Sequence, residues 1–369
     1  MDRDELAAWL RLVETPGLGR ESARRLLGEF GSPEAAIGAS TQARRAIVDM
    51  SVASALATEP PGFAALLGAT CAWLDAAGGE SRDVIVLGDP RYPQALLQAA
   101  DPPLVLYAKG RFDLLNATSI AIVGSRNPTA QGLDNARAFA AYLSRAGFVI
   151  VSGLALGIDG AAHEGALEGG GGTIAVVGTG LDRVYPARHR ALAHRITADG
   201  LIVSEFSIGT PALTPNFPIR NRIIAGLSRG TLVVEAAVQS GSLITARLAA
   251  DNGRDVFAIP GSIHSPQARG CHALIKQGAK LVDAAADILE EYAAAPVSRG
   301  LPGSTDPPAD VGKEDPLLAA LGFDPIGLDA LVARTGMAAS ELAARLLDLE
   351  LAGHVARLPG QIFQRLERA

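Results

Sequence analysis

Cysteine is scarce in this sequence, and long apolar segments are missing. Its 369 residues include only two cysteines, Cys71 and Cys271. They are too few for a disulfide framework and lack the paired spacing of metal ligands, so we expect both to be reduced and structural. The apolar runs have the length of strands, and the opening residues, MDRDELAAWL, carry acid where a secretion signal carries base. We therefore expect a cytoplasmic protein with no membrane partner and no metal site.

Lysine is the second scarcity. Only four of the 33 basic residues are lysine, so arginine carries almost all of the positive charge. The net charge of -6 argues against a protein that coats duplex DNA over its whole surface. A local groove is still allowed, because residues 111–229 hold 11 arginines against 8 acids. The arginines therefore concentrate in the middle of an acidic chain.

The first 75 residues predict a helical domain. Their apolar positions recur at helical spacing. Within residues 1–75, Pro16, Gly17 and Gly19 form a predicted tight turn before a helix that stops near Gly31. This arrangement is similar to a SAM-like or helix-hairpin-helix module, whose turn amides can hold a phosphate. A simple connection between two helices is the alternative.

Residues 76–292 alternate apolar runs with helical patterns. Near-continuous apolar strands that alternate with helices predict a parallel sheet covered on both faces, so we expect an α/β core with a Rossmann-like, doubly wound sheet. Ligands of such sheets bind beyond the carboxyl ends of the strands. The predicted strands are 84–88, 119–124, 149–153, 173–178, 201–206, 231–236 and 255–261, and the predicted helices include 130–146, 158–168, 188–198 and 242–251.

The C-terminal part of the sequence changes character twice. Residues 293–315 are rich in Ala, Pro, Gly and Ser and predict a flexible linker. Residues 316–369 then have the layout of a winged-helix domain, with two helices followed by a hairpin whose tip is Pro359-Gly360. Such modules bind either DNA or protein.

The second helix of this predicted winged helix is acidic. It offers Glu341, Asp348 and Glu350 against Arg345 alone. This charge disfavours duplex DNA as its ligand and favours a protein-contact or regulatory role.

The segment NFPIRNRIIAGLS, residues 216–228, sets an aromatic ring, a proline and two arginines against an apolar run. Guanidinium groups match phosphate oxygens in a bidentate fork, and a nearby ring can stack on an unpaired base. Single-stranded nucleic acid is therefore the first ligand to consider, with Phe217, Arg220 and Arg222 as contacts. In the alternative interpretation the arginines make structural ion pairs and Phe217 anchors a helix start.

Two further loops that follow predicted strands suit an anion. In GSRNPTAQG, Arg126 is placed for a phosphate contact and Ser125 can add a hydroxyl; a surface arginine that caps the loop is the alternative. In QSGS, Gly241 and Ser242 begin a helix whose dipole favours negative charge. The first loop lacks the spacing of a dinucleotide fingerprint, and the second lacks the Gly-Lys-Ser/Thr of a Walker loop.

Catalytic groups are harder to find. Asp159 and His163, one helical turn apart, would suit an acid-base pair or two metal ligands. No third ligand is evident at suitable spacing, so we favour a structural role in which Asp159 caps its helix and His163 packs at a domain interface. No G-x-S-x-G nucleophile motif occurs. Several anion-binding loops without an evident reaction centre indicate binding rather than catalysis.

Six segments together resemble the DNA processing protein A family, DprA, also called Smf. They occur in order between about residues 85 and 290, and the flanking helical and winged-helix modules match a common architecture of that family. The segments are GSRNPTAQG, SGLALGIDGAAHEGAL, VVGTGLDRVYPARH, NFPIRNRIIAGLS, EAAVQSGSLITARLAADNGRDVFAIPGS and GCHALIKQGAKLV.

This resemblance implies a function, partners and site residues. The function is to bind single-stranded DNA, without enzymatic activity or a known cofactor, and to load the recombinase RecA onto it during natural transformation. The implied partners also include single-strand-binding protein, which is displaced, and a second copy of the chain, bound through the Rossmann-like core. By position, the implied single-stranded DNA contacts are Ser125, Arg126, Phe217, Arg220, Asn221, Arg222, Gly241, Ser242, Thr245 and Lys276.

Two other interpretations stay open. Phosphoribohydrolases of the "lysine decarboxylase-like" group cleave nucleoside monophosphates on a related core, and their signature, P-G-G-x-G-T-x-x-E, ends in a catalytic acid. Here the matching loop places Arg247 near that acid, with no carboxylate before Asp251. The second of these interpretations is a protein-binding adaptor without affinity for DNA.

Overall fold

The computed structural model describes residues 1–76, 79–293, 315–322 and 325–366. Its N-terminal part is helical, as predicted. Asp2 starts the first helix by accepting hydrogen bonds from the amides of Asp4 and Glu5, and Gly31 ends the second helix in the left-handed conformation. The helices are α1 (Arg3–Glu14), α2 (Arg20–Phe30), α3 (Pro33–Gly38), α4 (Thr41–Arg45), α5 (Met50–Ala55) and α6 (Phe63–Asp75).

The core is a mixed sheet in the order β1-β2-β6-β5-β4-β3-β7-β8-β9. The seven strands from β6 to β9 in this order run parallel, whereas β2 is antiparallel to both of its neighbours. The order reverses between β3 and β7, so the doubly wound, Rossmann-like fold is confirmed. The strands are β1 (Arg82–Val86), β2 (Val105–Gly110), β3 (Ser119–Val123), β4 (Val149–Ser152), β5 (Thr173–Val176), β6 (Leu201–Ser204), β7 (Gly230–Val233), β8 (Asp255–Ala258) and β9 (Lys280–Leu281).

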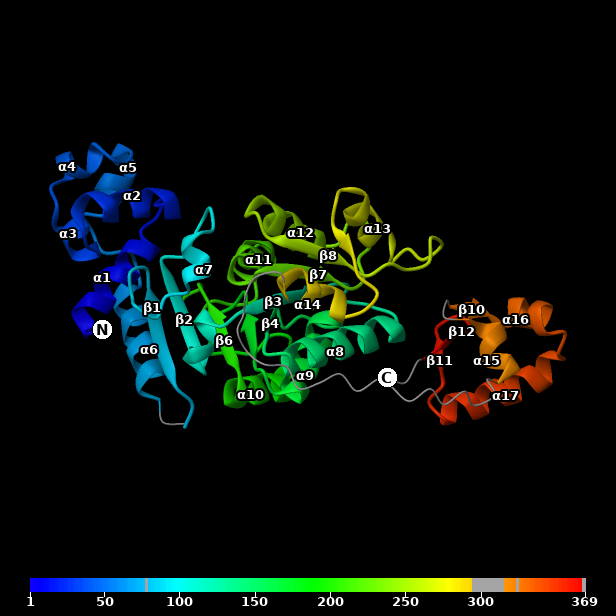
Figure 1. Cartoon of the computed structure of the whole chain (residues 1–369). Coiled ribbons are helices and arrows are strands. Elements are labelled where there is room, and N and C mark those ends of the chain that lie inside the picture. The colour runs from blue at the N-terminus through cyan, green and yellow to red at the C-terminus, as the bar shows by residue number, and fades with distance from the viewer. Residues whose placement is uncertain (77–78, 294–314, 323–324, 367–369) are drawn as a thin grey trace.

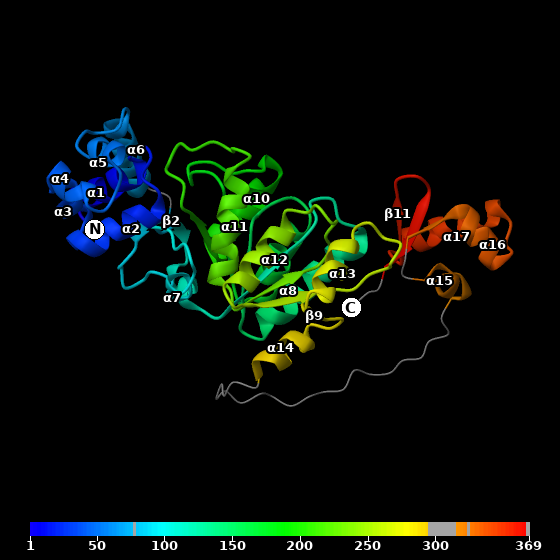
Figure 2. The same ribbon diagram turned by 90° about the horizontal axis from the view of Figure 1, so that it is seen from above.

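Helices cover both faces of this sheet (Figures 1 and 2). On one face α7, α11, α12 and α13 pack on apolar side chains of the strands, and on the other face α8, α9, α10 and α14 do the same. The strands are buried on both faces, which explains their near-continuous apolar sequences. The helices are α7 (Gln94–Leu97), α8 (Ala130–Arg145), α9 (Ile158–Gly169), α10 (Arg190–Asp199), α11 (Asn216–Leu227), α12 (Ser242–Asp251), α13 (Arg269–Lys276) and α14 (Ala286–Ala293), with 3-10 turns η1 (Phe112–Asn116) and η2 (Ala187–His189).

Strand β2 was absent from the prediction, and it explains how the helical N-terminus joins the core. It forms an antiparallel pair with β1, and the two strands present Val84, Val86 and Tyr107 to the N-terminal helices. Trp73 of α6 meets the Tyr107 ring edge-on, with 6.0 Å between the ring centroids. Leu10 of α1 is fully buried in the same cluster. The N-terminal helices and the sheet therefore share one continuous apolar core.

The C-terminal unit is a winged helix with its own core, as predicted. Its three-stranded sheet has the order β10-β12-β11, and Gly360 turns the hairpin with a φ of 88°. Arg345 of the second long helix pairs with Asp315 at 2.8 Å. The elements are α15 (Pro316–Leu321), β10 (Ile326–Gly327), α16 (Leu328–Thr335), α17 (Ala339–Leu351), β11 (Val355–Leu358) and β12 (Ile362–Arg365).

Two expectations concern other parts of the chain. The predicted linker at 293–315 lies almost wholly in residues 294–314, outside the described residues. Within the described part of the chain, no helix combines the length and the apolar character needed to cross a bilayer.

Candidate functional site

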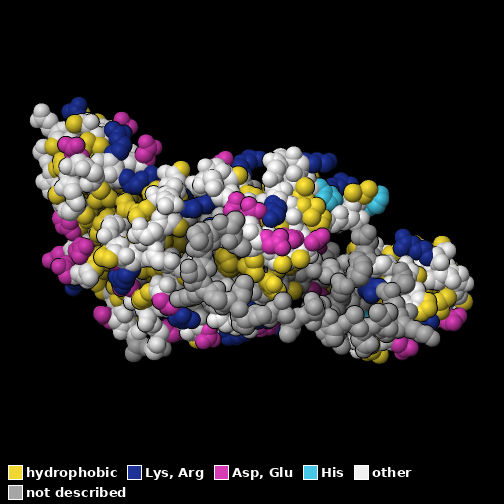
Figure 3. All heavy atoms as spheres, in the orientation of Figure 1, with side chains coloured by type: hydrophobic (Ala, Val, Ile, Leu, Met, Phe, Trp, Pro, Cys, Tyr) yellow, Lys and Arg dark blue, Asp and Glu magenta, His cyan; other side chains and the backbone are white. Residues whose placement is uncertain are grey.

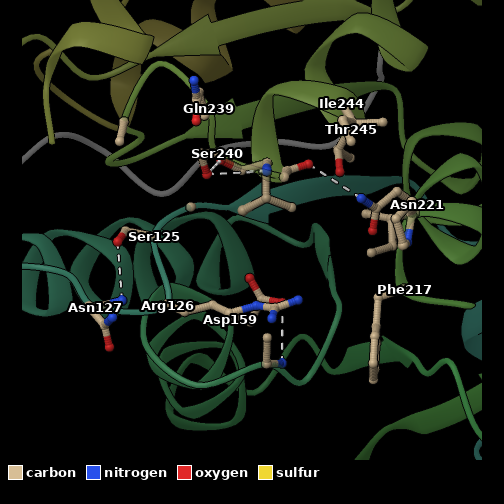
Figure 4. A pocket seen from close by; sticks show the side chains of 18 of the residues that line it. Ser125, Arg126, Asn127, Asp159, Phe217, Asn221, Gln239, Ser240, Ile244 and Thr245 are labelled. Atoms are coloured by element: carbon tan, nitrogen blue, oxygen red, sulfur yellow. Dashed lines mark hydrogen bonds between the residues drawn. The ribbon is translucent and has the colours of Figure 1, made fainter. Parts of the chain in front are cut away.

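A pocket of about 460 Å³ opens where the strand order reverses. Its walls come from the loop after β3, the first turns of α11, and the loop from β7 into α12. Figure 4 shows Ser125 and Asn127 on one side of the pocket, and Phe217 and Asn221 on the other. Parallel α/β sheets bind ligands at this reversal, because the loops diverge there and leave a crevice. Of the ten predicted site residues, eight line this pocket: Ser125, Arg126, Phe217, Arg220, Asn221, Gly241, Ser242 and Thr245.

The loop after β3 is held rigidly and leaves Arg126 exposed. The amide of Ser125 donates to the carbonyl of Glu235 at 2.7 Å, and the Glu235 carboxylate accepts from the amide and hydroxyl of Thr129, at 2.9 and 2.5 Å. Gly157, with a φ of 82°, passes so close that a Cβ there would lie 2.4 Å from the Ser125 carbonyl oxygen. The structure gives Arg126 no acidic partner within 4 Å among the residues it describes. Its guanidinium is therefore available to an anion.

Helix α11 contributes the aromatic side of the pocket. The Cζ of Arg126 lies 5.7 Å from the centroid of the Phe217 ring. Tyr185, which is not among the described residues that line the pocket, approaches the same ring, with 5.5 Å between centroids and 33° between ring planes. One turn after Phe217, Asn221 donates to the Gly241 carbonyl at 3.4 Å and so ties α11 to the start of α12. An apolar ring, a guanidinium and an amide thus meet at one rim.

The amino end of α12 forms the opposite wall. Ser240 and Ser242 share a hydrogen bond of 2.7 Å between their hydroxyl groups, and Gly241 is exposed between them. Thr245, one turn into the helix, is buried. A helix N-terminus carries partial positive charge, and small residues let an anion approach its amides. This wall is therefore suited to a phosphate.

Arg220 was predicted to contact a phosphate. It does line the pocket, but its guanidinium is already bound to the backbone. Its side chain is 4% exposed, and its Nη1 donates to the carbonyls of Gly153 and Val176 at the ends of β4 and β5. Burial lowers the pKa of the Arg220 guanidinium to about 10, although the nearby Asp159 carboxylate opposes the shift. Arg220 therefore fixes the pocket floor.

Asp159 and His163 have structural surroundings, but their predicted details were wrong. The N-cap of α9 is Gly157, and the Asp159 carboxylate instead accepts from the amides of Gly153 and Ala155, at 3.2 and 3.3 Å. Burial raises the pKa of Asp159. His163 is fully buried between α9 and β5, where its Nδ1 lies 2.7 Å from the Thr173 hydroxyl, and burial lowers its pKa to about 3. Both side chains hold the loop and helix that frame the pocket.

The placement of Arg222 in the pocket was wrong. Its Nη2 pairs with Glu205, and its Nη1 donates to the Asp101 carbonyl at 2.6 Å. Arg20 and Arg24 of α2 pair with the Asp101 carboxylate at 2.7 and 2.8 Å, so they too are engaged rather than offered to a phosphate. We call these five residues the docking cluster, because they join the N-terminal helices to the core. Arg222 points away from the pocket because it lies on another face of α11.

Lys276 was also expected at the rim, and the structure does not bring it there. It is exposed at the end of α13 and is not among the described residues that line the pocket. Reasoning from the sequence missed Asn127, Gln239 and Gln267, which line the pocket from three different loops. Asn127 and Gln239 each follow a predicted strand by three residues, which was their only signal, whereas Gln267 lies six residues after one.

The face of the core seen in Figure 3 is mixed in charge. In the view of Figure 3, Lys and Arg side chains lie along the upper edge of the core over α12 and α13, with Asp and Glu side chains beneath them. This pattern fits a net charge of -6 with a local basic rim.

Comparison with known proteins identifies the family to which this chain belongs. Residues 83–293 match the family model described as DNA recombination-mediator protein A, and residues 302–361 match the DprA winged helix domain. The chain belongs to this DNA recombination-mediator protein A family, also known as DprA or Smf.

Particular relatives support the assignment. The chain is 44% identical over 289 residues to Protein Smf of Escherichia coli, which covers 75% of this chain and 76% of the relative. It is 50% identical over 204 residues to the DNA processing protein DprA of Streptococcus pneumoniae, with coverages of 55% and 72%.

Two solved structures are similar as well. The structure of DNA processing protein A from Streptococcus pneumoniae superposes with a TM-score of 0.64 at 38% identity, covering 79% of this chain and 98% of that one. A structure of the Helicobacter pylori protein, which describes its single-stranded DNA binding mode, gives a TM-score of 0.53 at 30% identity, with coverages of 58% and 96%.

Proposed function

We propose that the protein binds single-stranded DNA in the pocket between β3 and β7 and does not cleave it. The observation that carries this proposal is the exposed Arg126 guanidinium, 5.7 Å from the Phe217 ring centroid and across the pocket from the amino end of α12. A guanidinium and helix amides suit phosphates, and the half-buried ring suits an unpaired base. Duplex DNA keeps its bases stacked, so a pocket that needs a free base favours single strands.

The pocket chemistry supports binding over hydrolysis. Among the described residues that line it, Asp159 is the only carboxylate, and it is occupied by two backbone amides. Arg247, near the position where a phosphoribohydrolase would carry its acid, is exposed on α12 and lies outside this lining. A nucleotide hydrolase would need a carboxylate that is free to act on substrate.

A direct comparison of ligands tests the proposal. Fluorescence anisotropy with labelled oligo-dT and with a duplex of equal length, at one fixed salt concentration, should show tighter binding of the single strand. Arg126→Ala should reduce that affinity, and Arg145→Ala, an exposed arginine at the far end of α8, should not. Equal binding of duplex and single strand, or an unchanged affinity of Arg126→Ala, would refute it. Release of free base from nucleoside monophosphates would favour the hydrolase instead.

We further propose, from the family resemblance, that the bound strand is passed to RecA during natural transformation and that single-strand-binding protein is displaced. RecA ATPase on oligo-dT coated with single-strand-binding protein should start faster when this protein is present. The Arg126→Ala variant should lose this effect, because it holds the strand less tightly. An unchanged lag with the wild-type protein would contradict the loading role.

We also propose a homodimer through the Rossmann-like core. The edge strand β9 supports this, because Leu281 is 47% exposed beside a groove of about 670 Å³ lined by Leu243 and Leu274. Light scattering coupled to gel filtration should give twice the monomer mass for the wild type and the monomer mass for Leu281→Glu. A monomeric wild type would exclude the dimer.

A further inference from the structure

Tyr185 contacts the candidate site but belongs to a different loop. It follows β5, and its ring packs against Phe217 with 5.5 Å between centroids. The ring is nevertheless 50% exposed, and it is not part of the pocket lining. An aromatic side chain in an apolar core would be covered, whereas this one presents half of its surface to solvent beside the ring of the pocket.

The strand order places the loop after β5, which carries Tyr185, at the same edge of the sheet as the pocket. The carboxyl ends of β7, β3, β4 and β5 follow one another in that order, and neighbouring strands are about 4.8 Å apart. The path from the α12 wall, after β7, to the loop after β5 is therefore roughly 14 Å along the sheet edge. Phe217, which lines the pocket, also lies against the loop after β5. A Cβ on Gly178, two residues beyond that strand, would be 3.2 Å from the Phe217 ring.

The residues after Tyr185 are basic and unpaired. Segment 182–190 contains three arginines and one acid. Asp182 pairs with Arg183 at 2.8 Å, but Arg188 and Arg190 are exposed and have no acidic partner within 4 Å among the described residues. The two free guanidinium groups follow the exposed ring by three and five residues, which is an arrangement suited to phosphates beside a stacked base.

The loop is also fixed in place before any ligand arrives. The Nδ1 of His189 lies 3.0 Å from the Leu154 carbonyl oxygen, and the ring is so close to α9 that a Cβ on Gly160 would lie 2.7 Å from it. A preorganised surface loses less conformational entropy on binding than a mobile one. The loop therefore has the rigidity expected of a binding surface.

We propose that Tyr185, Arg188 and Arg190 form a second part of the single-stranded DNA site, which continues the strand from the pocket across Phe217 toward the loop after β5. Tyr185 stacks on a base outside the pocket, and the two arginines contact phosphates that follow it. This inference rests on the proposed function, since it requires that the pocket holds a single strand.

Oligonucleotide length separates this site from the pocket. Affinities of wild type, Tyr185→Ala and Tyr185→Phe are measured for oligo-dT lengths from about 4 to about 16 nucleotides, the range of known single-strand sites. Tyr185→Ala should lose about 5- to 150-fold on the longer oligonucleotides, the range expected for one stacked base, and little on the shortest. Tyr185→Phe keeps the ring and should bind like wild type.

The salt dependence of oligo-dT binding tests the roles of Arg188 and Arg190. Arg188→Ala and Arg190→Ala should each lower the salt dependence on long oligo-dT by about one phosphate and leave the shortest oligonucleotide unaffected. Arg145→Ala, at the far end of α8, removes the same charge and should change neither the salt dependence on long oligo-dT nor the binding of the shortest oligonucleotide. If Arg188→Ala and Arg190→Ala leave the salt slope on long oligo-dT unchanged, the phosphate track is wrong.

A reporter tests whether Tyr185 touches DNA or only positions Phe217. Tyr185→Trp should show fluorescence quenching on addition of long oligo-dT and not of the shortest, because a stacked base quenches indole. A loss of affinity in Tyr185→Ala that is equal for all lengths, with no quenching in Tyr185→Trp, would overturn the proposal and leave the pocket intact. Failure of the wild type to bind any length would instead refute the proposed function, and this inference with it.

Discussion

Replacement of Arg222 by alanine should cost stability rather than DNA affinity. In the docking cluster Arg222 pairs with Glu205, whose side chain is only 9% exposed. Removing one partner of a buried pair costs about 3 to 5 kcal/mol when the other charge is left uncompensated. Here Arg20, whose Nη1 lies 3.9 Å from the Glu205 carboxylate, compensates part of that charge. Asp101 is more exposed and keeps Arg20 and Arg24, so its contribution to the loss is small. We expect Arg222→Ala to lower the free energy of unfolding by an amount near the lower end of this range.

The loss should depend on pH. Burial raises the pKa of Glu205, and Arg222 opposes that shift. Without Arg222 the pKa of Glu205 in the folded protein should rise further. A carboxyl whose folded-state pKa is raised stabilises the fold at low pH, and that contribution is lost as the pH rises through the folded-state pKa. The difference in stability between Arg222→Ala and wild type should therefore shrink as the pH falls through the raised pKa of Glu205.

Urea unfolding followed by tryptophan fluorescence measures this, because Trp9 and Trp73 are buried in the N-terminal helices that the docking cluster joins to the core. The double variant Arg222→Met/Glu205→Gln removes both charges and should recover much of the stability. Oligo-dT affinity of Arg222→Ala should stay near wild type. A stable Arg222→Ala variant with weakened oligo-dT binding would refute this reasoning and return Arg222 to the DNA site.

Three further outcomes are expected. Arg126→Ala should weaken oligo-dT binding and lower its salt slope by about one phosphate, with an unchanged melting temperature, because the side chain is exposed. Phe217→Ala should lose about 1 to 3 kcal/mol per stacked base with a nearly unchanged slope, and a change confined to the slope would mean that the ring does not stack. Gly157→Ala should destabilise the protein and disturb the pocket, since its Cβ would lie 2.4 Å from the Ser125 carbonyl oxygen; differential scanning fluorimetry that shows wild-type stability would contradict this.

Most of the architecture was predictable because its signal is local. Buried strands such as β3 and β7 read as continuous apolar runs, and their helices follow at regular distance. Strand β2 was missed because its sequence, VLYAKG, carries a lysine and lies at the antiparallel end of the sheet, where no crossover helix marks it.

Site residues were predicted correctly where their position after a strand determines their place in the fold. They were predicted wrongly or missed where their place depends on contacts with residues that are distant in sequence. Arg126 and the start of α12 follow strands, so the rule for parallel sheets places them. Arg220 and Arg222 were assigned from their residue type and from the family resemblance. Only the folded chain shows that the carbonyls of Gly153 and Val176 bind Arg220 and that Glu205 pairs with Arg222. Tyr185 escaped notice because its partner, Phe217, is 32 residues away.

The pairing of β1 with β2 has a consequence for how the molecule can be divided. These strands carry Val84, Val86 and Tyr107, which are buried in one apolar cluster with side chains of the N-terminal helices, including α1 and α6. A fragment that began at residue 80 would keep the whole sheet yet uncover this apolar stripe, and such surfaces promote self-association. The N-terminal helices therefore form part of the core. Proteolysis between these helices and β1 should yield an insoluble product instead of two independently folded domains.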